Sequence, residues 1–272
     1  MGKITFLGTG TSQGVPMIGC DCSVCLSDNK KDKRLRSSAL IEYNGFKILI
    51  DCGPDFRQQM LREGIKDVDA VLLTHQHKDH TGGLDDIRAF NYFRHEAFPI
   101  YAEQIVQESL KMEYAYAFSD YKYPGAPEYD LRTITQEPFH IIKNVKNGNP
   151  DILLITPIRV LHHRLPILGF RIGDLAYITD ASSIPNDEFT KLTGLNTLVI
   201  NCVREERHLS HFSLDEALEN AWRINAKKTY LTHLSHQIGT HNELCDKIKQ
   251  RRLSGKIKMP DQVEPAYDGL KV

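Results

Sequence analysis

A cluster of histidine and aspartate side chains directly follows an apolar run near residue 75. Residues 70–74 are apolar up to Thr74 and predict a short buried strand, and the next six residues read His-Gln-His-Lys-Asp-His. Neutral imidazoles and ionised carboxylates bind borderline divalent metals well. Three of the 12 histidines fall within these six positions, which a polar loop without function would rarely show. The stretch therefore predicts a metal site at the end of a strand, rather than a histidine-rich surface turn.

The same succession of strand and ligand recurs later in the chain. The apolar run 152–160 leads to His162, the run 176–179 leads to Asp180, and the run 230–232 leads to His233. A single histidine after a strand is usually a polar turn residue. Four strands that all end in metal-capable residues instead predict one site along a shared sheet edge.

The rest of the chain alternates between strand and helix signals. Asn44-Gly45 predicts a hairpin between residues 37–43 and 46–50. Capping boxes predict that helices start at Ser213 and Thr240. The other expected elements are strands at 3–7, 197–202 and 266–270, helices at 54–63, 83–93 and 103–118, and a solvated loop at 28–36.

The composition is that of a soluble globular protein with an ample core. The 272 residues are 41% hydrophobic and 25% charged, with a net charge of −1. No overall field draws such a chain to nucleic acid or to an anionic membrane. There is no signal-peptide pattern and no run near the ~18 apolar residues of a membrane span. We therefore expect a cytoplasmic protein that does not bind membranes.

A second group of ligands lies before the histidine cluster. Cys20, Cys22 and Cys25 are close together, while the other three cysteines are scattered. In a reducing compartment, clustered thiols indicate metal rather than disulfides. Three thiolates leave a tetrahedral zinc ion one ligand short, so a fourth must come from elsewhere. The alternative is a loop with three reduced cysteines and no metal.

The motif His-x-His-x-Asp-His occupies residues 75–80, and His162, Asp180 and His233 follow it in order. With these residues, the sequence resembles the metallo-β-lactamase superfamily over nearly the whole chain. Within it, the sequence looks closest to phosphoribosyl cyclic phosphodiesterases of phosphonate breakdown (PhnP-like proteins). This narrower resemblance rests on Leu7-Gly8-Thr9-Gly10, Gln13-Gly14-Val15-Pro16, Gly19-Cys20-x-Cys22-x-x-Cys25, Leu231-Thr232-His233-x-Ser235-His236-Gln237 and Asp268-Gly269. It implies an α/β fold, a four-layer αββα sandwich of two mixed β-sheets with a dinuclear metal site at their edge.

The resemblance also implies which residues hold metal. One ion would take His75, His77 and His162, the other would take Asp79, His80 and His233, and Asp180 would bridge them. His162 is preferred to His163 because the family pattern continues with Arg164-Leu165-Pro166. A third, structural zinc ion would be bound by Cys20, Cys22, Cys25 and His236. Asp51 resembles a residue that supports the site from a strand end.

The expected chemistry is attack on phosphorus. Two divalent ions ~3.5–4 Å apart can share a bridging hydroxide and hold both the attacking and the leaving oxygen. An alkoxide leaving group needs a proton. His211 resembles the family's catalytic histidine, with His208 as a nearby alternative, and Asp79 is expected to act in catalysis as well as to bind metal. These ligand types do not separate zinc from manganese.

The sequence thus predicts a metal-dependent phosphodiesterase for a small cyclic phosphodiester or nucleotide-like substrate. The alternatives are a lactone or thioester hydrolase on the same metal pair, a tRNA 3′-processing nuclease, and a binding module without catalysis. Nucleic acid is disfavoured as a partner because the excursion near 119–150 is not strongly basic. Arg164, Arg204 and Arg207 could clamp phosphate or be solvated. We expect one domain over 1–272, with a Cys-rich zinc-binding loop near 19–36, and a homodimer stays an open alternative.

Overall fold

The computed structural model describes residues 2–143 and 148–272 and contains two β-sheets. The first sheet has the strand order β1 to β6. Its first three strands are antiparallel, and β3 to β6 run parallel to one another. The strands are β1 (Lys3–Gly8), β2 (Ser38–Tyr43), β3 (Phe46–Ile50), β4 (Ala70–Leu72), β5 (Phe98–Ala102) and β6 (Tyr129–Thr133).

The second sheet contains the later strands in the order β13-β12-β11-β10-β9-β8-β7. Strands β10 to β13 are parallel, and β7 to β10 are joined as antiparallel neighbours. The strands are β7 (Phe139–Lys143), β8 (Asp151–His162), β9 (Leu165–Ile172), β10 (Leu175–Ile178), β11 (Thr197–Asn201), β12 (Lys228–Thr232) and β13 (Val263–Pro265).

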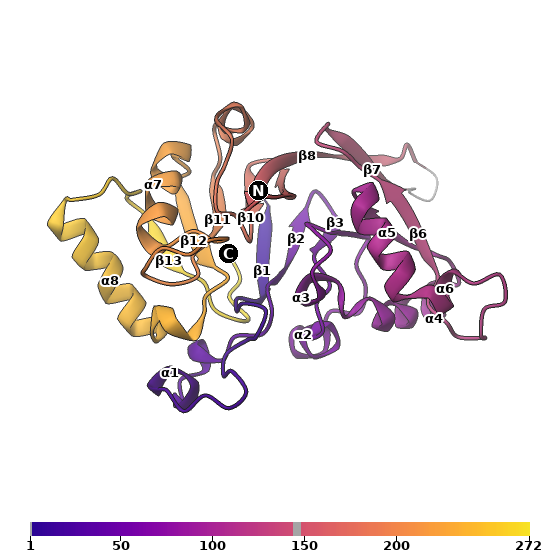
Figure 1. The fold of residues 1–272 in the computed structure, drawn as a ribbon. Coiled ribbons are helices and arrows are strands. Elements are labelled where there is room, and N and C mark those ends of the chain that lie inside the picture. The colour runs from indigo at the N-terminus through magenta and orange to yellow at the C-terminus, as the bar shows by residue number, and fades with distance from the viewer. Residues whose placement is uncertain (1, 144–147) are drawn as a thin grey trace.

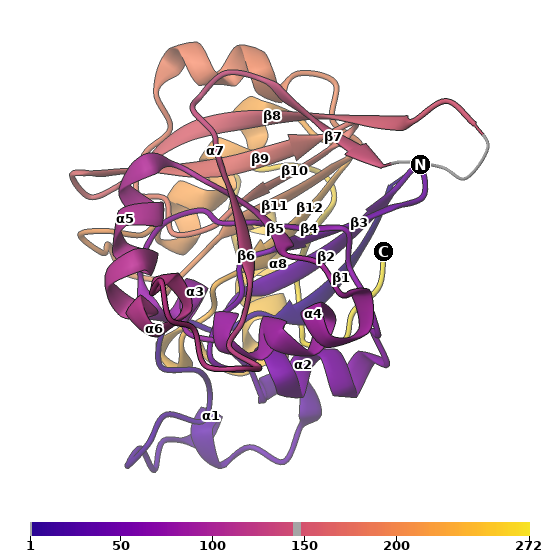
Figure 2. The same cartoon turned by 90° about the vertical axis from the view of Figure 1, so that its right-hand side faces the viewer.

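Helices cover the outer faces of both sheets. Figure 1 shows α7 and α8 outside the second sheet, and Figure 2 shows α2, α4 and α5 beside the first. The α-helices are α1 (Ser23–Leu26), α2 (Phe56–Glu63), α3 (Lys78–Thr81), α4 (Arg88–Arg94), α5 (Gln104–Glu113), α6 (Ala115–Phe118), α7 (Leu214–Ile224) and α8 (His241–Ser254). The 3₁₀ turns are η1 (Lys30–Asp32), η2 (Leu84–Ile87), η3 (Asn186–Leu192) and η4 (His236–Ile238).

Three apolar layers hold this arrangement together. The central layer joins the inner faces of the two sheets, with Phe6, Ile48, Phe170 and Tyr177 all buried. A second layer lies between the first sheet and its helices, and a third lies between the second sheet and α7 and α8. Strands β3, β4, β10 and β11 thus bury side chains on both faces, which accounts for the near-continuous apolar runs in the sequence. The expected four-layer αββα sandwich is confirmed.

Several local expectations from the sequence are wrong. Residues 28–36 are not a solvated loop, because Asp32 and Arg34 are buried there. The tail at 266–270 is not a strand, and β13 lies just before it. Strands β5 and β9 were not anticipated, and the helix expected at 103–118 is divided into α5 and α6.

The expected excursion near 119–150 connects the two sheets. It contains β6, at one edge of the first sheet, and β7, at one edge of the second. Its residues 144–147 lie outside the described part of the chain. Among the described helices, none is long and apolar enough to cross a membrane.

Candidate metal centre

The predicted ligands gather because the strands that carry them end at the same edge. β3 and β4 are parallel neighbours, and so are β10, β11 and β12. Residues that follow these strands therefore meet where the two sheets adjoin. Asp51, Asp180 and His233 each stand just past a strand with a positive φ of 57° to 59°. A left-handed backbone is unfavourable for such residues, and its recurrence at three strand ends marks a site where side-chain direction matters.

One group of imidazoles forms the first candidate site. His75, His77 and His162 each offer a nitrogen, and these nitrogens lie within 4.8 Å of one another. Nε2 of His75 is 3.0 Å from Nδ1 of His77. Two nitrogens bound to one zinc ion at tetrahedral angles would be about 3.3 Å apart. The three residues thus fit a common ion, and the adjacent His163 is exposed and outside this group.

A second group adjoins the first and shares His75 with it. His75, His80 and Asp180 also present ligand atoms within 4.8 Å of one another. Asp79 and His233 are outside that set but touch its members. Oδ2 of Asp79 is 3.1 Å from Nε2 of His80, and Nδ1 of His233 is 3.3 Å from Oδ2 of Asp180.

The far nitrogens of the imidazoles are held by fixed partners. Nδ1 of His80 lies 2.6 Å from Oδ2 of Asp51. Nδ1 of His162 lies 2.9 Å from the carbonyl oxygens of Asp180 and Ser210, which can only accept a hydrogen. These contacts place the hydrogen on Nδ1 and leave the Nε2 lone pairs free for metal.

His80 supplies the clearest test of whether a metal fits. Its Nε2 is fully buried and has no hydrogen-bond partner in the described structure, although it faces the carboxylates of Asp79 and Asp180. A buried polar atom without a partner is costly unless something else satisfies it. Burial alone would lower the pKa of His80, but Asp180, Asp51 and Asp79 outweigh burial and hold that pKa well above its ordinary value. The position therefore favours positive charge, as a cation site should.

The other titratable groups have the protonation states that metal ligands need. Burial lowers the pKa of His75, His77 and His233, so these imidazoles are neutral near neutral pH. Burial would raise the pKa of Asp180, but His233 and His80 hold it well below its ordinary value. Neutral imidazoles and an ionised carboxylate can bind a divalent ion without first losing protons.

His211 lies over the same centre, between two of the predicted ligands. Its ring centroid is 4.7 Å from those of both His162 and His233, and its Nδ1 is 3.7 Å from Oδ1 of Asp180. That nitrogen is buried without a hydrogen-bond partner in the described structure. Burial and the neighbouring His233 lower the pKa of His211 to about 3. His208 is more exposed and lies 5.0 Å from the His211 ring.

The arginines singled out from the sequence are not gathered around the ligands. Arg204 donates to Oε1 of Gln237 and to the carbonyl oxygen of Arg207, so it shapes the loop that carries His211. The Arg207 side chain is 91% exposed and pairs with Glu216. Arg164 is exposed.

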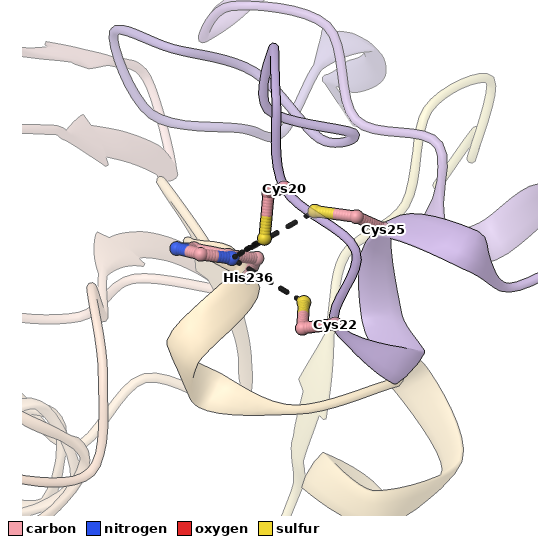
Figure 3. Close-up of side chains that lie close together, drawn as sticks. All are labelled: Cys20, Cys22, Cys25 and His236. Carbon is pink, nitrogen blue, oxygen red and sulfur yellow. Dashed lines mark hydrogen bonds between the residues drawn. The ribbon is translucent and has the colours of Figure 1, made fainter.

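The Cys-His cluster is a separate candidate site, shown in Figure 3. Nδ1 of His236 lies 3.2 Å from Sγ of Cys20, 3.4 Å from Sγ of Cys22 and 3.7 Å from Sγ of Cys25. Zinc bound tetrahedrally by sulfur and nitrogen would hold the two atoms about 3.6 Å apart. One imidazole nitrogen cannot share hydrogens with three thiols at once, so the arrangement fits a metal ion better than a hydrogen-bond cluster.

The surroundings shift the pKa values of two of the thiols in opposite directions. A hydrogen bond from the Cys25 backbone lowers the pKa of Cys22 to about 6. Burial raises the pKa of Cys25 to about 11, and the Met17 N–H donates to its sulfur at 3.4 Å. A bound cation would stabilise both thiolates.

A buried ion pair, not anticipated from the sequence, ties this N-terminal loop to the segment after β12. Arg34 is 1% exposed, lies 3.5 Å from Asp32, and donates to the carbonyl oxygens of Ser235 and Gly239 at 2.8 and 2.9 Å. Asp32 in turn accepts from the backbone of His241 at 2.6 Å. The loop with the three cysteines is thereby fixed to the segment that holds His236.

Comparison with known proteins defines the class of this fold and site. A family model described as a beta-lactamase superfamily domain matches residues 47–234. The chain therefore belongs to the metallo-β-lactamase superfamily. The solved structure of a diphosphatase from the PhnP family is similar over 100% of this chain and 97% of its own, with 36% identity and a TM-score of 0.84. This full-length likeness confirms the narrower resemblance found in the sequence.

Two curated relatives add context. A Porphyromonas gingivalis protein named octanoyltransferase is 40% identical over 99% of this chain, and the chain spans about half of that relative's length, 51%. A ribonuclease Z of Methanopyrus kandleri is 49% identical over 53 residues, which are 19% of this chain and 19% of the relative.

Proposed function

We propose that the chain is a metal-dependent phosphodiesterase that hydrolyses a small cyclic phosphodiester or nucleotide-like substrate. The observation that carries the proposal is the pair of adjoining ligand groups, which share His75. Two ions held side by side suit displacement at phosphorus, because both the attacking and the leaving oxygen carry negative charge. The full-length likeness to a diphosphatase of the PhnP family supports a phosphorus centre.

We assign the ions to the ligands as follows. His75, His77 and His162 would hold one ion, Asp79, His80 and His233 the other, and Asp180 would lie between them. When bound, the ions would supply a hydroxide nucleophile and stabilise negative charge on the phosphoryl oxygens. Asp51 and the main-chain carbonyls of Asp180 and Ser210 keep the imidazoles directed at the site.

His211 is the proposed proton donor to the leaving oxygen. It lies against both His162 and His233 and remains 12% exposed in its side chain, so one edge can meet a substrate. Its lowered pKa makes it neutral in the free chain. An anionic phosphodiester placed beside it would favour the protonated form, so the acid would be charged only when substrate is present.

The test is a comparison of substrates with and without metal. The metal-stripped protein is assayed on bis(p-nitrophenyl) phosphate, a cyclic nucleotide, a dinucleoside diphosphate, a lactone and a β-lactam, before and after Zn²⁺ or Mn²⁺ is restored. We expect metal-dependent turnover of the phosphorus substrates only. Absence of phosphodiester turnover with either metal would refute the proposal.

One relative favours a second candidate function, hydrolysis of an acyl thioester at the same centre. The Porphyromonas gingivalis protein that matches 99% of this chain is named octanoyltransferase, and about half of its own length lies outside the match. An octanoyl thioester therefore belongs in the same assay. Its turnover at a rate above that of every phosphorus substrate would replace the first proposal.

A third candidate, tRNA 3′ processing, is favoured by short matches to ribonuclease Z proteins, such as the one that covers 19% of this chain. We propose a single catalytic domain over 1–272 that acts on small molecules in the cytoplasm. A structural zinc ion would be bound by Cys20, Cys22, Cys25 and His236. Metal analysis of the purified protein should then find three ions per chain.

A further inference from the structure

A serine at the end of the N-terminal loop touches one of the proposed metal ligands. Ser37 is 1% exposed, and its Oγ lies 3.2 Å from Nδ1 of His233. The same Oγ donates to the carbonyl oxygen of Gly10 at 2.8 Å. A hydroxyl has a single hydrogen, and here the carbonyl takes it. The Ser37 oxygen can therefore only accept a hydrogen from His233.

This contact decides which nitrogen of His233 is free for metal. Oδ2 of Asp180, at 3.3 Å from Nδ1, is a second acceptor on the same side of the ring. With acceptors on that side, the hydrogen stays on Nδ1 and the lone pair stays on Nε2. If the oxygens of Asp180 faced cations, they would accept a hydrogen less well. Oγ1 of Thr179 lies farther from Nδ1, at 3.5 Å, so Ser37, at 3.2 Å, would be the principal partner of Nδ1.

The same arrangement recurs at a ligand that follows a strand of the other sheet. Oγ1 of Thr74 lies 2.9 Å from Oδ2 of Asp51 and 2.9 Å from Nδ1 of His75. The hydroxyl donates to the carboxylate and so presents a lone pair to the imidazole. His233 and His75 thus each face a hydroxyl oxygen whose own hydrogen is bound to another acceptor.

The acceptor of the Ser37 hydrogen is itself fixed in place. The Gly10 N–H donates to the carbonyl of Leu35 at 2.7 Å, and Gly10 forms bridges to Arg36 and Leu234. A Cβ at Gly10 would come within 2.7 Å of the Arg34 carbonyl oxygen, so no side chain fits. The Gly10 carbonyl cannot turn away, which keeps the Ser37 hydrogen committed to it.

We propose that Ser37 is a positioning residue of the metal centre: it holds His233 in the Nδ1–H tautomer, with its own hydrogen bound to the Gly10 carbonyl. The inference rests on the proposed metal centre and does not depend on the substrate. Among the proposed site residues, Ser37 contacts His233 and acts through that imidazole.

The test compares Ser37→Ala with Ser38→Ala. Ser38 is the next residue, is equally buried, and donates to the main-chain carbonyls of Ile50 and Asp51 without touching an imidazole. Each zinc-loaded variant is titrated with a competing chelator. Ser37→Ala should lower the affinity for one of the three ions about 10- to 100-fold, the usual effect of removing a partner of a ligating histidine. Ser38→Ala should leave all three affinities unchanged.

A second measurement uses the unaltered protein. In nitrogen-15 NMR spectra of the zinc-loaded chain, His233 should show a protected Nδ1–H, as should His80 and His162. Ser37→Ala should lose only the His233 signal. An Nε2–H tautomer of His233 in the unaltered protein, or equal weakening of ions in the two variants, would overturn the proposal. Neither readout involves turnover, so a failed phosphodiesterase assay would be a separate result.

Discussion

The carboxylate of Asp51 and the imidazole of His80 form a fully buried pair, with Oδ2 and Nδ1 2.6 Å apart. The same carboxylate accepts from the backbone N–H and the hydroxyl of Thr74, which in turn holds His75. Asp51 thus orients two proposed ligands, one directly and one through a hydroxyl. Its position just past β3, with a φ of 59°, places it beneath the ligands that follow β4.

Replacement of Asp51 by Asn should weaken metal binding while the fold persists. The Asp51 carboxylate now accepts from both Nδ1 of His80 and Thr74. The NH₂ group of an amide in its place would face one of these two donors and could not accept from it. If the NH₂ group faces His80, the imidazole must move its hydrogen to Nε2, which blocks the lone pair that binds metal. We expect a loss of about 10- to 100-fold in affinity for an active-site ion. Chelator competition measures it, and unchanged affinity would show that Asp51 does not orient His80.

Replacement of His75 by Ala should abolish turnover and leave the fold intact. His75 belongs to both adjoining ligand groups, so its loss should affect both ions. His75 is not one of the residues of the three apolar layers, so the fold should persist without it. His140→Ala, at an exposed position on β7, is the matched control and should retain full activity. Circular dichroism checks the fold, and substantial residual turnover in His75→Ala would contradict the assignment.

Much of the candidate site could be predicted from the sequence because the candidate ligands are local signals. An apolar run followed at once by His or Asp marks a strand end, and the parallel strands bring those ends together. The hairpin at Asn44-Gly45 and the capping boxes at Ser213 and Thr240 were equally local and are present. Such signals need no knowledge of distant partners.

The features that were missed depend on distant partners. Arg34 and Asp32 stand in a charged stretch that resembles a solvated loop, and their burial follows from contacts more than 200 residues away. Ser37 has no signature of its own, since its partner His233 is 196 residues further on.

Two strands are not predicted for a different reason. Strand β5 contains Pro99, and β9 contains Pro166 and Gly169, residues that normally argue against a strand.

Replacement of His211 by Gln should lower kcat and leave metal content unchanged. The side chain lies over the proposed ligands, but His80 is oriented by Asp51, and His162 by the main-chain carbonyls of Asp180 and Ser210. Loss of a general acid typically costs about 10²- to 10⁴-fold in rate. The deficit should shrink for a substrate such as bis(p-nitrophenyl) phosphate, whose leaving group needs little protonation, and grow for an alkyl phosphodiester. An equal deficit on both substrates would mean that His211 does not donate the proton.

Replacement of Cys22 by Ala should remove the structural zinc ion and lower thermal stability. Cys22 supplies one of four ligand atoms gathered around His236, and the loop it belongs to packs on the segment after β12. Zinc binding to such a set contributes directly to folding free energy, so the melting temperature should fall as one ion per chain is lost. Cys245→Ala is the control, because Cys245 lies on α8 outside the cluster and should change neither quantity. Because His236 follows His233 by three residues, Cys22→Ala should also weaken the binding of the active-site ion that we assign to His233. If metal content and melting temperature both matched those of the Cys245 variant, the four residues would not form a zinc site.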